Sequence, residues 1–576
     1  FLSEHILTQN AVINVTDREN GYIRQYFIHC VPPSHEYFER ETIKCITPNL
    51  TIQNVDKPLG FIRKFAPDGK LLISFSHNQR CLEIFEYKGV HAVSSLLKSI
   101  KTECILSSDF SPECLTIRQK VFERIFHSKK TICVEPGIPS CLLNREFSIF
   151  MENGRYVLVA ATMHCDGGFI PASTDLQSFV DLYDDCEFLS YFFYLIDLQS
   201  LSVNDRFVYQ NDYIILSHNN GVSVHGSIIA VLSKYRQNID LFELAQGKIV
   251  KLTSIGDFRD DLDATLLIEF PQSSVTTVCM TRNKFPLTFL KQRILAYLYR
   301  RIVNIEMDQV TQRGELRKFY KDYGIRMVLS KIQLIDEDNI LIRYEEREGE
   351  GIAGDKQQTG FKLYVFFCIS EGTILKVFPK DSVELLYLFR DFCDNFRNVR
   401  SMHTQRPPSS SSNNIFLRES FNNAVTTTPG GRNGAALRFN PTLPISTQSF
   451  TTTQYMDFNI FDYDDNFISA LERPKISSLE PINFRDRNTN ITKFRLFLDS
   501  PGLRFDNNGN HMISANFGRE LVAFLFHPYE PFLISIQKIS THYIVNFHIY
   551  NGATIVQKYA HTDKRSGAYQ RLAELS

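Results

Sequence analysis

The feature of this sequence that most constrains its fold is a recurring pattern of short alternating strands joined by tight turns. Residues 62–87 contain three such strands, separated by a Pro-Asp-Gly turn and a polar turn. The same pattern returns at residues 145–162, around Asn153-Gly154, and at residues 521–550, around His527-Pro528. One meander cannot bury both of its faces, and radial stacking of similar units solves that problem. The pattern therefore predicts a mainly β, WD-repeat-like β-propeller.

Further segments have the alternation of additional blade strands, and together they suggest seven or eight blades. These segments are residues 188–198, 213–216, 227–232, 239–244, 328–344 and 363–378. The 47 phenylalanines and 25 tyrosines suit pleated surfaces, whereas the absence of tryptophan argues against standard WD repeats, which carry a Trp-Asp pair. A large β-sandwich or two separate β domains is the alternative architecture.

Between residues 285 and 325 the apolar period changes from two to about 3.6, which predicts a basic helical insertion. A second helix is expected from Glu315 to Tyr323. Two interpretations are open: an arm presented to a partner, or an insertion packed on the wall of the propeller. Under the first, the partner-binding residues are Leu287, Leu290, Arg293, Ile294, Tyr297, Arg300 and Arg301.

Residues 399–440 are rich in Ser, Asn, Thr, Gly and Pro, which predicts a disordered linker because little apolar surface is available to offset ordering entropy. Residues 345–360 are expected to form a mobile loop. Residues 384–396 have the apolar spacing of an amphipathic helix. The remaining divisions are a divergent segment at 1–48, blades at 49–284, 326–398 and 441–557, and a polar tail at 558–576.

The sequence contains no recognisable catalytic or metal-binding motif. There is no Gly-x-Ser-x-Gly elbow, phosphate-binding glycine loop or His-Glu-x-x-His sequence. Asp462, Asp464 and Asp465 lack the further ligands and glycine of a calcium loop, so they are interpreted as a polar turn. His542 and His548 fall on one face of a strand pattern, but packing or surface roles are more usual there. We therefore expect no enzyme activity, cofactor or metal.

The 12 cysteines are dispersed and form no Cys-x-x-Cys pair, which argues against zinc ribbons and RING domains. Their dispersal is more typical of a cytosolic or nuclear protein than of a disulfide scaffold. The formal net charge of −1 gives no global attraction to nucleic acid or membrane. The apolar stretch at residues 191–198 is too short to span a bilayer. The chain opens at Phe1 rather than Met, so its native N-terminus is expected to lie further upstream.

Several long blocks resemble the De-etiolated-1 family in the same order along the chain. They include NLTIQNVDKPLGFIRKFAPDGK at 49–70, IILSHNNGVSVHGSIIAVLS at 214–233 and LKQRILAYLYRR at 290–301. The most distinctive are LPISTQSFTTTQYMDFNIFDYDDNFISALERPK at 443–475 and LVAFLFHPYEPFLISIQ at 521–537. The resemblance covers about residues 49–550, and the first forty residues match poorly.

This resemblance implies a non-catalytic subunit of a cullin-4 ubiquitin ligase in the nucleus. Such a subunit would dock on the damaged-DNA-binding adaptor and its small accessory subunit. It would recruit a ubiquitin-conjugating enzyme and the constitutive-photomorphogenic-type ligase, so that proximity promotes ubiquitination of transcription regulators. Association with histones is compatible with the family. A chromatin-binding or repressor scaffold outside ubiquitin transfer is the main rival, and a propeller hydrolase would need converging polar residues in the central channel.

Two expectations concern particular segments. Residues 1–6 could be the end of an adaptor-docking helical element, and the strand at 22–31 is expected to lie near the C-terminal strands and close the ring. The block at 443–475 leaves the linker with an aromatic string that includes Tyr455, Phe458 and Phe461. It either re-enters the propeller, the favoured interpretation, or docks a partner.

Overall fold

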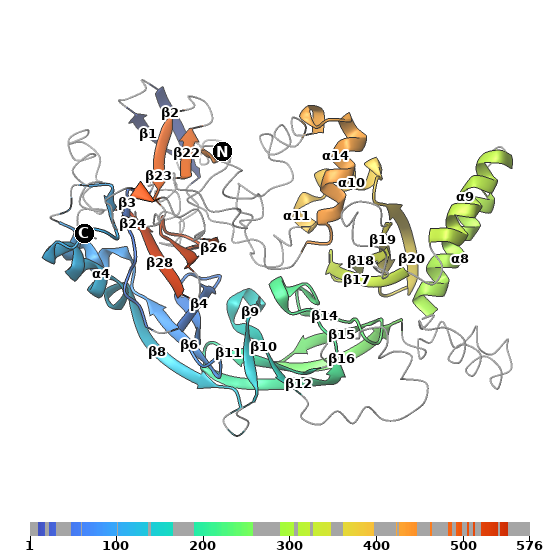
Figure 1. The fold of residues 1–576 in the computed structure, drawn as a ribbon, viewed down its shortest axis with the longest axis horizontal. Coiled ribbons are helices and arrows are strands. Elements are labelled where there is room, and N and C mark those ends of the chain that lie inside the picture. The colour runs from blue at the N-terminus through green and yellow to red at the C-terminus, as the bar shows by residue number, and fades with distance from the viewer. Residues whose placement is uncertain are drawn as a thin grey trace, which may run out of the picture.

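The computed structural model describes the β-rich body of the chain and several of its insertions. The described residues are 10–17, 22–29, 48–58, 60–98, 100, 102–135, 137, 140–164, 189–256, 289–304, 309–322, 327–346, 361–396, 422, 425–445, 461–463, 482–486, 491–497, 504–505, 511–512, 520–539 and 542–550. Antiparallel sheets, mostly of four strands, lie side by side around an arc (Figure 1).

The first sheet is the meander predicted at residues 62–87, extended by one strand. It has the order β4-β5-β6-β8, formed by Gly60–Phe65, Leu71–Ser76, Cys81–Tyr87 and Phe126–Cys133. The turn between β4 and β5 is the predicted Pro-Asp-Gly sequence. Its glycine, Gly69, has a left-handed φ of +72°, which glycine adopts without steric cost. Between β6 and β8 the chain forms η1 (Val90–Val93), α3 (Ser94–Leu97), β7 (Cys104–Ile105) and α4 (Pro112–Ile125).

Three more four-stranded sheets follow in chain order. The second contains β9 (Leu142–Met151), β10 (Tyr156–His164), β11 (Leu189–Asp197) and β12 (Ser202–Asp212), with η2 (Glu152–Gly154) at its first turn. The third contains β13 (Val222–His225), β14 (Ile228–Ser233), β15 (Asn238–Ala245) and β16 (Lys248–Ile255), and η3 (Ser217–Asn219) precedes it. The fourth contains β17 (Met327–Leu334), β18 (Asn339–Glu346), β19 (Lys362–Cys368) and β20 (Thr373–Pro379).

The prediction of a strand at residues 213–216 is wrong. These residues form no strand. The strand that pairs with β14 is β13, which begins six residues after Leu216. Ile214 and Leu216 are buried in the core beside it, so their alternation reflects packing rather than strand pairing.

The C-terminal strands share a sheet with a strand from the start of the body. β26 (Glu520–Phe526), β27 (Leu533–Ile539) and β28 (His542–Ile549) are followed by β3 (Leu50–Ile52) and β7. The prediction that residues 22–31 provide this closing strand is wrong, because β2 (Tyr22–His29) pairs with β1 (Asn10–Asp17). All three residues of β3 are buried, so this strand lacks the alternating buried and exposed faces that would mark it in the sequence.

The hydrophobic core lies between successive sheets rather than within any one of them. The cluster that contains Phe75 and Ile84 of the first sheet also contains Val157 and Ile196 of the second. Similar clusters join the second sheet to the third, the third to the fourth, and the C-terminal sheet to the first. Each sheet thus buries its faces against its neighbours, at about 1.5–3 kcal/mol for each fully buried large apolar side chain. The predicted mainly β, propeller-type fold is confirmed, and the number of blades stays a prediction.

Smaller sheets lie among the later residues. β21 (Phe461–Tyr463), β22 (Ile482–Asp486) and β23 (Thr492–Leu496) form a three-stranded sheet, in which the Phe484 and Phe494 rings stack 4.4 Å apart. β24 (Arg504–Phe505) pairs with β25 (His511–Met512).

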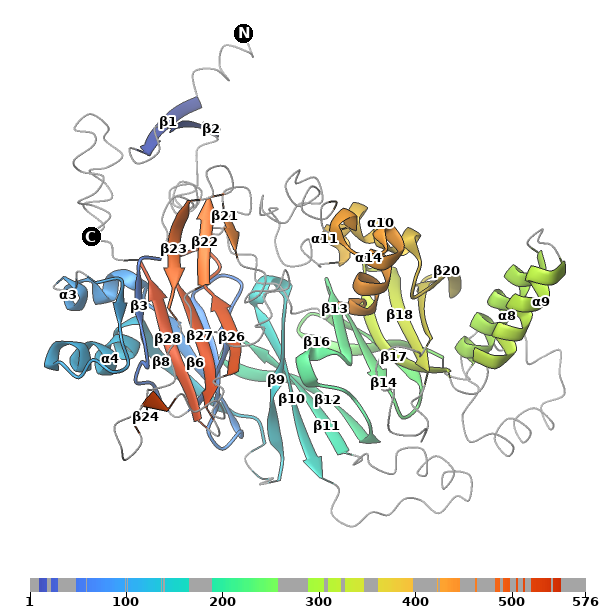
Figure 2. The ribbon, with the colours of Figure 1, turned by 45° about the horizontal axis from the view of Figure 1, so that its top comes forward.

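The change of period correctly predicts a helical insertion between residues 285 and 325. α8 (Phe289–Asn304) and α9 (Gln309–Asp322) form a hairpin beside β20, whereas α10 (Val383–Asp391), α11 (Cys393–Phe396) and α14 (Gly431–Phe439) gather at one end of the fourth sheet (Figure 2). η5 (Asn440–Thr442) follows α14.

The prediction of a disordered linker across residues 399–440 is wrong for its last part. α14 is an ordered helix there, and Ala435 and Ala436 are buried beside Leu386 of α10. The two alanines allow α14 to approach α10, and the Phe439 ring at the end of α14 packs 4.4 Å from the Phe389 ring of α10. Most of residues 399–424 lies outside the described residues, as do residues 347–360 of the predicted mobile loop.

Cys81 and Cys133 form a disulfide, although the dispersed cysteines predicted a chain without a disulfide framework. The two residues lie opposite each other on β6 and β8, 52 positions apart in sequence. Linear spacing does not reveal such a pairing, because the strand register creates it.

Candidate interaction surfaces

The predicted apolar face of the helical insertion is used inside the protein. Leu290 and Ile294 of α8 are buried, 2% and 0% exposed, and pack with Met327 and Val377 of the fourth sheet. Tyr297 is partly buried against the same cluster. The structure therefore supports the second interpretation, an insertion packed on its own wall. Leu287 lies outside the described residues.

The predicted basic residues of α8 divide into two kinds. Arg293 donates to the Gly372 carbonyl at 2.9 Å, and Arg301 donates to the Val377 carbonyl at 3.2 Å, so both tie α8 to β20 and the turn before it. Arg300 is exposed. Lys291 is buried, which lowers the pKa of its ammonium group to about 8. A partner role for these residues stays a prediction.

The aromatic block at 443–475 begins inside the fold. Leu443 and Ile445 are buried with Leu341 and Tyr364 of the fourth sheet, and the Gln333 side chain accepts a hydrogen bond from the Ile445 amide at 2.7 Å. These contacts support re-entry for the start of the block. Phe461 begins β21, which pairs with β22, whereas Tyr455 and Phe458 lie outside the described residues.

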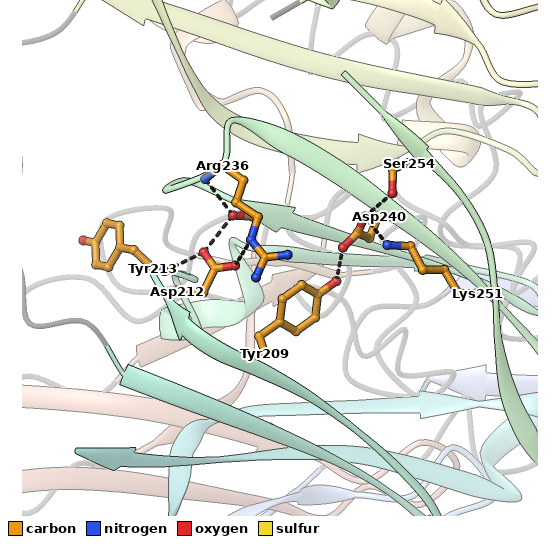
Figure 3. Close-up of polar contacts among 8 residues, drawn as sticks. Tyr209, Asp212, Tyr213, Arg236, Asp240, Lys251 and Ser254 are labelled. Atoms are coloured by element: carbon orange, nitrogen blue, oxygen red, sulfur yellow. Dashed lines mark hydrogen bonds and ion pairs between the residues drawn. The ribbon is translucent and has the colours of Figure 1, made fainter. Parts of the chain in front are cut away.

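Figure 3 shows two groups of polar contacts, one around Asp212 at the end of β12 in the second sheet and one around Asp240 of β15 in the third. The carboxylate of Asp212 accepts hydrogen bonds from Ser233 Oγ and the Tyr213 amide, both at 2.7 Å, and Arg236 Nε lies 3.5 Å away. Burial raises the pKa of Asp212. The side chain is 0% exposed, so a substrate could not reach it.

The second aspartate, Asp240, links two sheets. It accepts a hydrogen bond from Tyr209 Oη of β12 at 2.8 Å and pairs with Lys251 Nζ at 2.9 Å (Figure 3). Ser254 Oγ also donates to it. Burial and the Asp240 charge together raise the pKa of the Tyr209 hydroxyl. Asp240 is satisfied by its neighbours, whereas Asp212 Oδ2 has no hydrogen-bond partner among the described residues and faces only Arg236. The contacts of both aspartates connect the second sheet to the third.

A buried polar chain fastens the closing strand, and one of the predicted histidines belongs to it. His548 of β28 is 0% exposed, and its two ring nitrogens lie 2.9 Å from Thr51 Oγ1 of β3 and 2.9 Å from Ser535 Oγ of β27. Burial lowers its pKa to about 3. His542 is exposed at the start of the strand. His548 therefore has a packing role, the more usual one for a strand histidine.

His527 makes a second link that sequence reasoning missed. Its Nδ1 accepts from the amides of Tyr529 and Glu530, so Nε2 carries the proton and donates to the Gly69 carbonyl at 2.9 Å. Its ring also packs on Phe65 and Tyr87, and burial lowers its pKa to about 4. The His-Pro turn of the C-terminal sheet is thereby joined to the Pro-Asp-Gly turn of the first sheet. The two turn motifs were visible in the sequence, but their contact was not.

Within the described ranges, no group of three or more His, Cys, Asp or Glu residues is placed to hold a metal ion. None of the described helices is both long enough and apolar enough to cross a membrane.

The strand pairing and the inter-sheet cores define a propeller-type protein whose ordered polar clusters join its sheets. Comparison with known families gives the more particular assignment: the family model "De-etiolated protein 1 Det1" matches residues 145–551. The chain belongs to this family, as its sequence blocks indicated.

Curated relatives extend the match over most of the chain. The Light-mediated development protein DET1 of Solanum lycopersicum is 28% identical over 522 residues, covering 86% of this chain and 91% of that protein. The protein of the same name from Arabidopsis thaliana is 27% identical over 528 residues, with the same coverage.

Solved structures similar to this one include two propellers. The Dos1 propeller is 9% identical with a TM-score of 0.27, covering 88% of this chain and 96% of that structure. The C-terminal WD40 domain of Sif2 is 6% identical with a TM-score of 0.20, covering 88% and 99%. At these scores the fold assignment rests on the strand pairing described above.

Proposed function

We propose that this protein is a non-catalytic subunit of a cullin-4-type ubiquitin ligase that acts in the nucleus. It docks on the damaged-DNA-binding adaptor with a small accessory subunit, and it recruits a ubiquitin-conjugating enzyme and a constitutive-photomorphogenic-type ligase. Transcription regulators are the substrates. The observation that carries the proposal is the family match over residues 145–551.

The internal architecture is consistent with a scaffold. Asp212, Asp240, His527 and His548 are four buried titratable groups, and each is engaged in joining sheets or turns. A scaffold of this kind accelerates ubiquitin transfer by holding enzyme and substrate at high effective concentration.

The test is purification of the full chain from nuclear extract under native conditions, with quantification of the proteins that co-elute. Near-stoichiometric recovery of the cullin-4 adaptor is expected. The purified complex should also increase ubiquitin-chain formation by an added conjugating enzyme, compared with the same ligase lacking this subunit. Recovery of histones without the adaptor, from folded protein, would contradict the proposal and favour a chromatin-binding scaffold.

A further inference from the structure

The hairpin of α8 and α9 exposes one ordered surface that the packing of the body does not use. Figure 2 shows the hairpin projecting from the end of the arc beside β20. α8 provides the attachment through Ile294 and the two arginine contacts described above. α9 is attached chiefly to α8: Phe319 packs 5.9 Å from the Tyr299 ring, and Gln312 donates to the Ile302 carbonyl.

The outer side of α9 carries a stripe of exposed residues at helical spacing. Val310, Arg313, Arg317 and Tyr320 follow one another at intervals of three, four and three residues, the spacing of a helix–helix seam. Val310 is 79% exposed and Tyr320 is 70% exposed, and both arginines are exposed. At 100° per residue, this stripe lies about a third of a turn from the face formed by Gln312 and Phe319.

The residues of the stripe indicate which charge a helix bound to it would carry. Two arginines lie between two apolar residues, and among the described residues neither arginine forms an ion pair that would neutralise it. Guanidinium groups are suited to bidentate pairing with carboxylates. A complementary helix would therefore place carboxylates in the middle and apolar residues at both ends.

Gly314 leaves open space next to the stripe. It occupies the middle of α9, where glycine costs roughly 0.5–1 kcal/mol relative to alanine, and an added Cβ would meet no atom within 4 Å. At 100° per residue it lies beside the stripe, about 100° from Arg313 and about 60° from Arg317 around the helix axis. The absence of a side chain here leaves room for the backbone of a second helix.

We propose that the stripe Val310–Arg313–Arg317–Tyr320 is a docking surface for an acidic amphipathic helix of a partner protein. α9 has 14 residues and is about 21 Å long, so the partner helix would need about four turns. This surface does not depend on the ligase role proposed above.

The test uses the full chain and a fluorescent helical peptide with leucines at the ends of one face and glutamates between them. Fluorescence anisotropy is measured at low and high salt, with a lysine-for-glutamate peptide, a proline-interrupted acidic peptide and a duplex DNA as comparisons. The acidic helix is expected to bind, and to bind more weakly at high salt. Arg313→Glu with Arg317→Glu should weaken binding at least about tenfold. The matched control variant replaces Lys120 and Arg124, two exposed residues of α4, with glutamate. It should bind the acidic peptide as tightly as the unchanged protein does.

Gly314→Leu separates docking from helix stability. Leucine is the better helix former, so α9 should be as stable or more stable by hydrogen exchange, yet the peptide should bind at least several-fold more weakly because the side chain fills the close-approach site. Three results would overturn the proposal: no binding of the acidic helix at low salt, equal binding by the charge-reversed variant, or tighter binding of DNA that depends on the same arginines.

Discussion

At the scale of single residues, two buried histidines and one glycine hold the junction between the two ends of the body. His548 joins β28 to β3, and His527 joins the last sheet to the turn at Gly69. Both rings are neutral, because protonation in a buried site costs solvation free energy. Each therefore makes the stability of the fold depend on pH.

The first prediction concerns acidification. The pKa values of His527 and His548 are lowered from 6.5 to about 4 and about 3, so below pH 6.5 the unfolded chain binds protons that the folded chain does not. Their stabilising contribution is complete above pH 6.5 and is lost as the pH falls toward 4, by up to about 1.4 kcal/mol per pH unit for each histidine. Urea unfolding at pH 7 and pH 5 measures the slope, and His548→Gln should reduce it. An unchanged slope in that variant would contradict the assignment.

The second prediction concerns Gly69. An added Cβ would lie 2.6 Å from the His527 ring, and φ is +72°, so Gly69→Ala combines a clash with backbone strain. Gly431, with φ of +59° and no atom within 4 Å, gives a matched control that reports the strain alone, about 1–2 kcal/mol. Thermal unfolding of the two variants should show a larger loss for Gly69→Ala. Equal losses would mean that the His527 contact has little energetic weight.

At the scale of elements, the insertions show that an amphipathic pattern predicts a helix but not the surface it covers. α8 turns its apolar face toward β20, so residues expected at a partner interface form part of the core. In the predicted helix at 384–396, Leu385 and Phe389 are buried, whereas the apolar residue Phe392 is the C-terminal cap of α10 and is 54% exposed.

The third prediction tests the attachment of α8. Ile294→Ala removes a side chain that is 0% exposed and should cost about 2–5 kcal/mol. Amide hydrogen exchange should accelerate in α8 and in β20 together, because the two elements share this core. Arg300→Ala, an exposed change on the same helix, should alter exchange by less than about 0.5 kcal/mol. Faster exchange in α8 without any change in β20 would show that the helix is not part of the sheet's core.

At the scale of the whole molecule, the two ends of the described body are held in one sheet. β3 pairs with β28, and the core between this sheet and the first sheet includes residues from both ends of the chain, such as Ile52 and Phe547. In contrast, β1 and β2 pair with each other in a two-stranded sheet that stands apart from the body in Figure 2. Stability of the body should therefore depend on β3 and not on the strands before it.

The fourth prediction follows from this difference. A chain that begins at residue 48 should keep its thermal unfolding temperature within a few degrees of the full chain. A chain that begins at residue 54 lacks β3 and should lose several degrees or fail to fold, with rapid proteolysis in β26–β28. If both truncations behave alike, the closing strand does not stabilise the body.

The three main meanders, the helical insertion and the family could be read from the sequence alone. Alternation with a period of two located the meanders at residues 62–87, 145–162 and 521–550, and the change to a period of 3.6 located α8 and α9. These signals are local, since each depends on which face of a single element is apolar. The family blocks were equally readable, because they are contiguous.

The tertiary structure alone decided which elements meet. The Thr51–His548 contact joins residues 497 positions apart, and the Cys81–Cys133 pair depends on strand register. α14 packs on α10 through two alanines and Phe439, within a segment whose composition is mostly polar. The contact of His527 with Gly69 likewise joins two turns that were each predicted separately. Periodicity shows that a face must be buried, but the choice of partner depends on packing between distant segments, which no local pattern records.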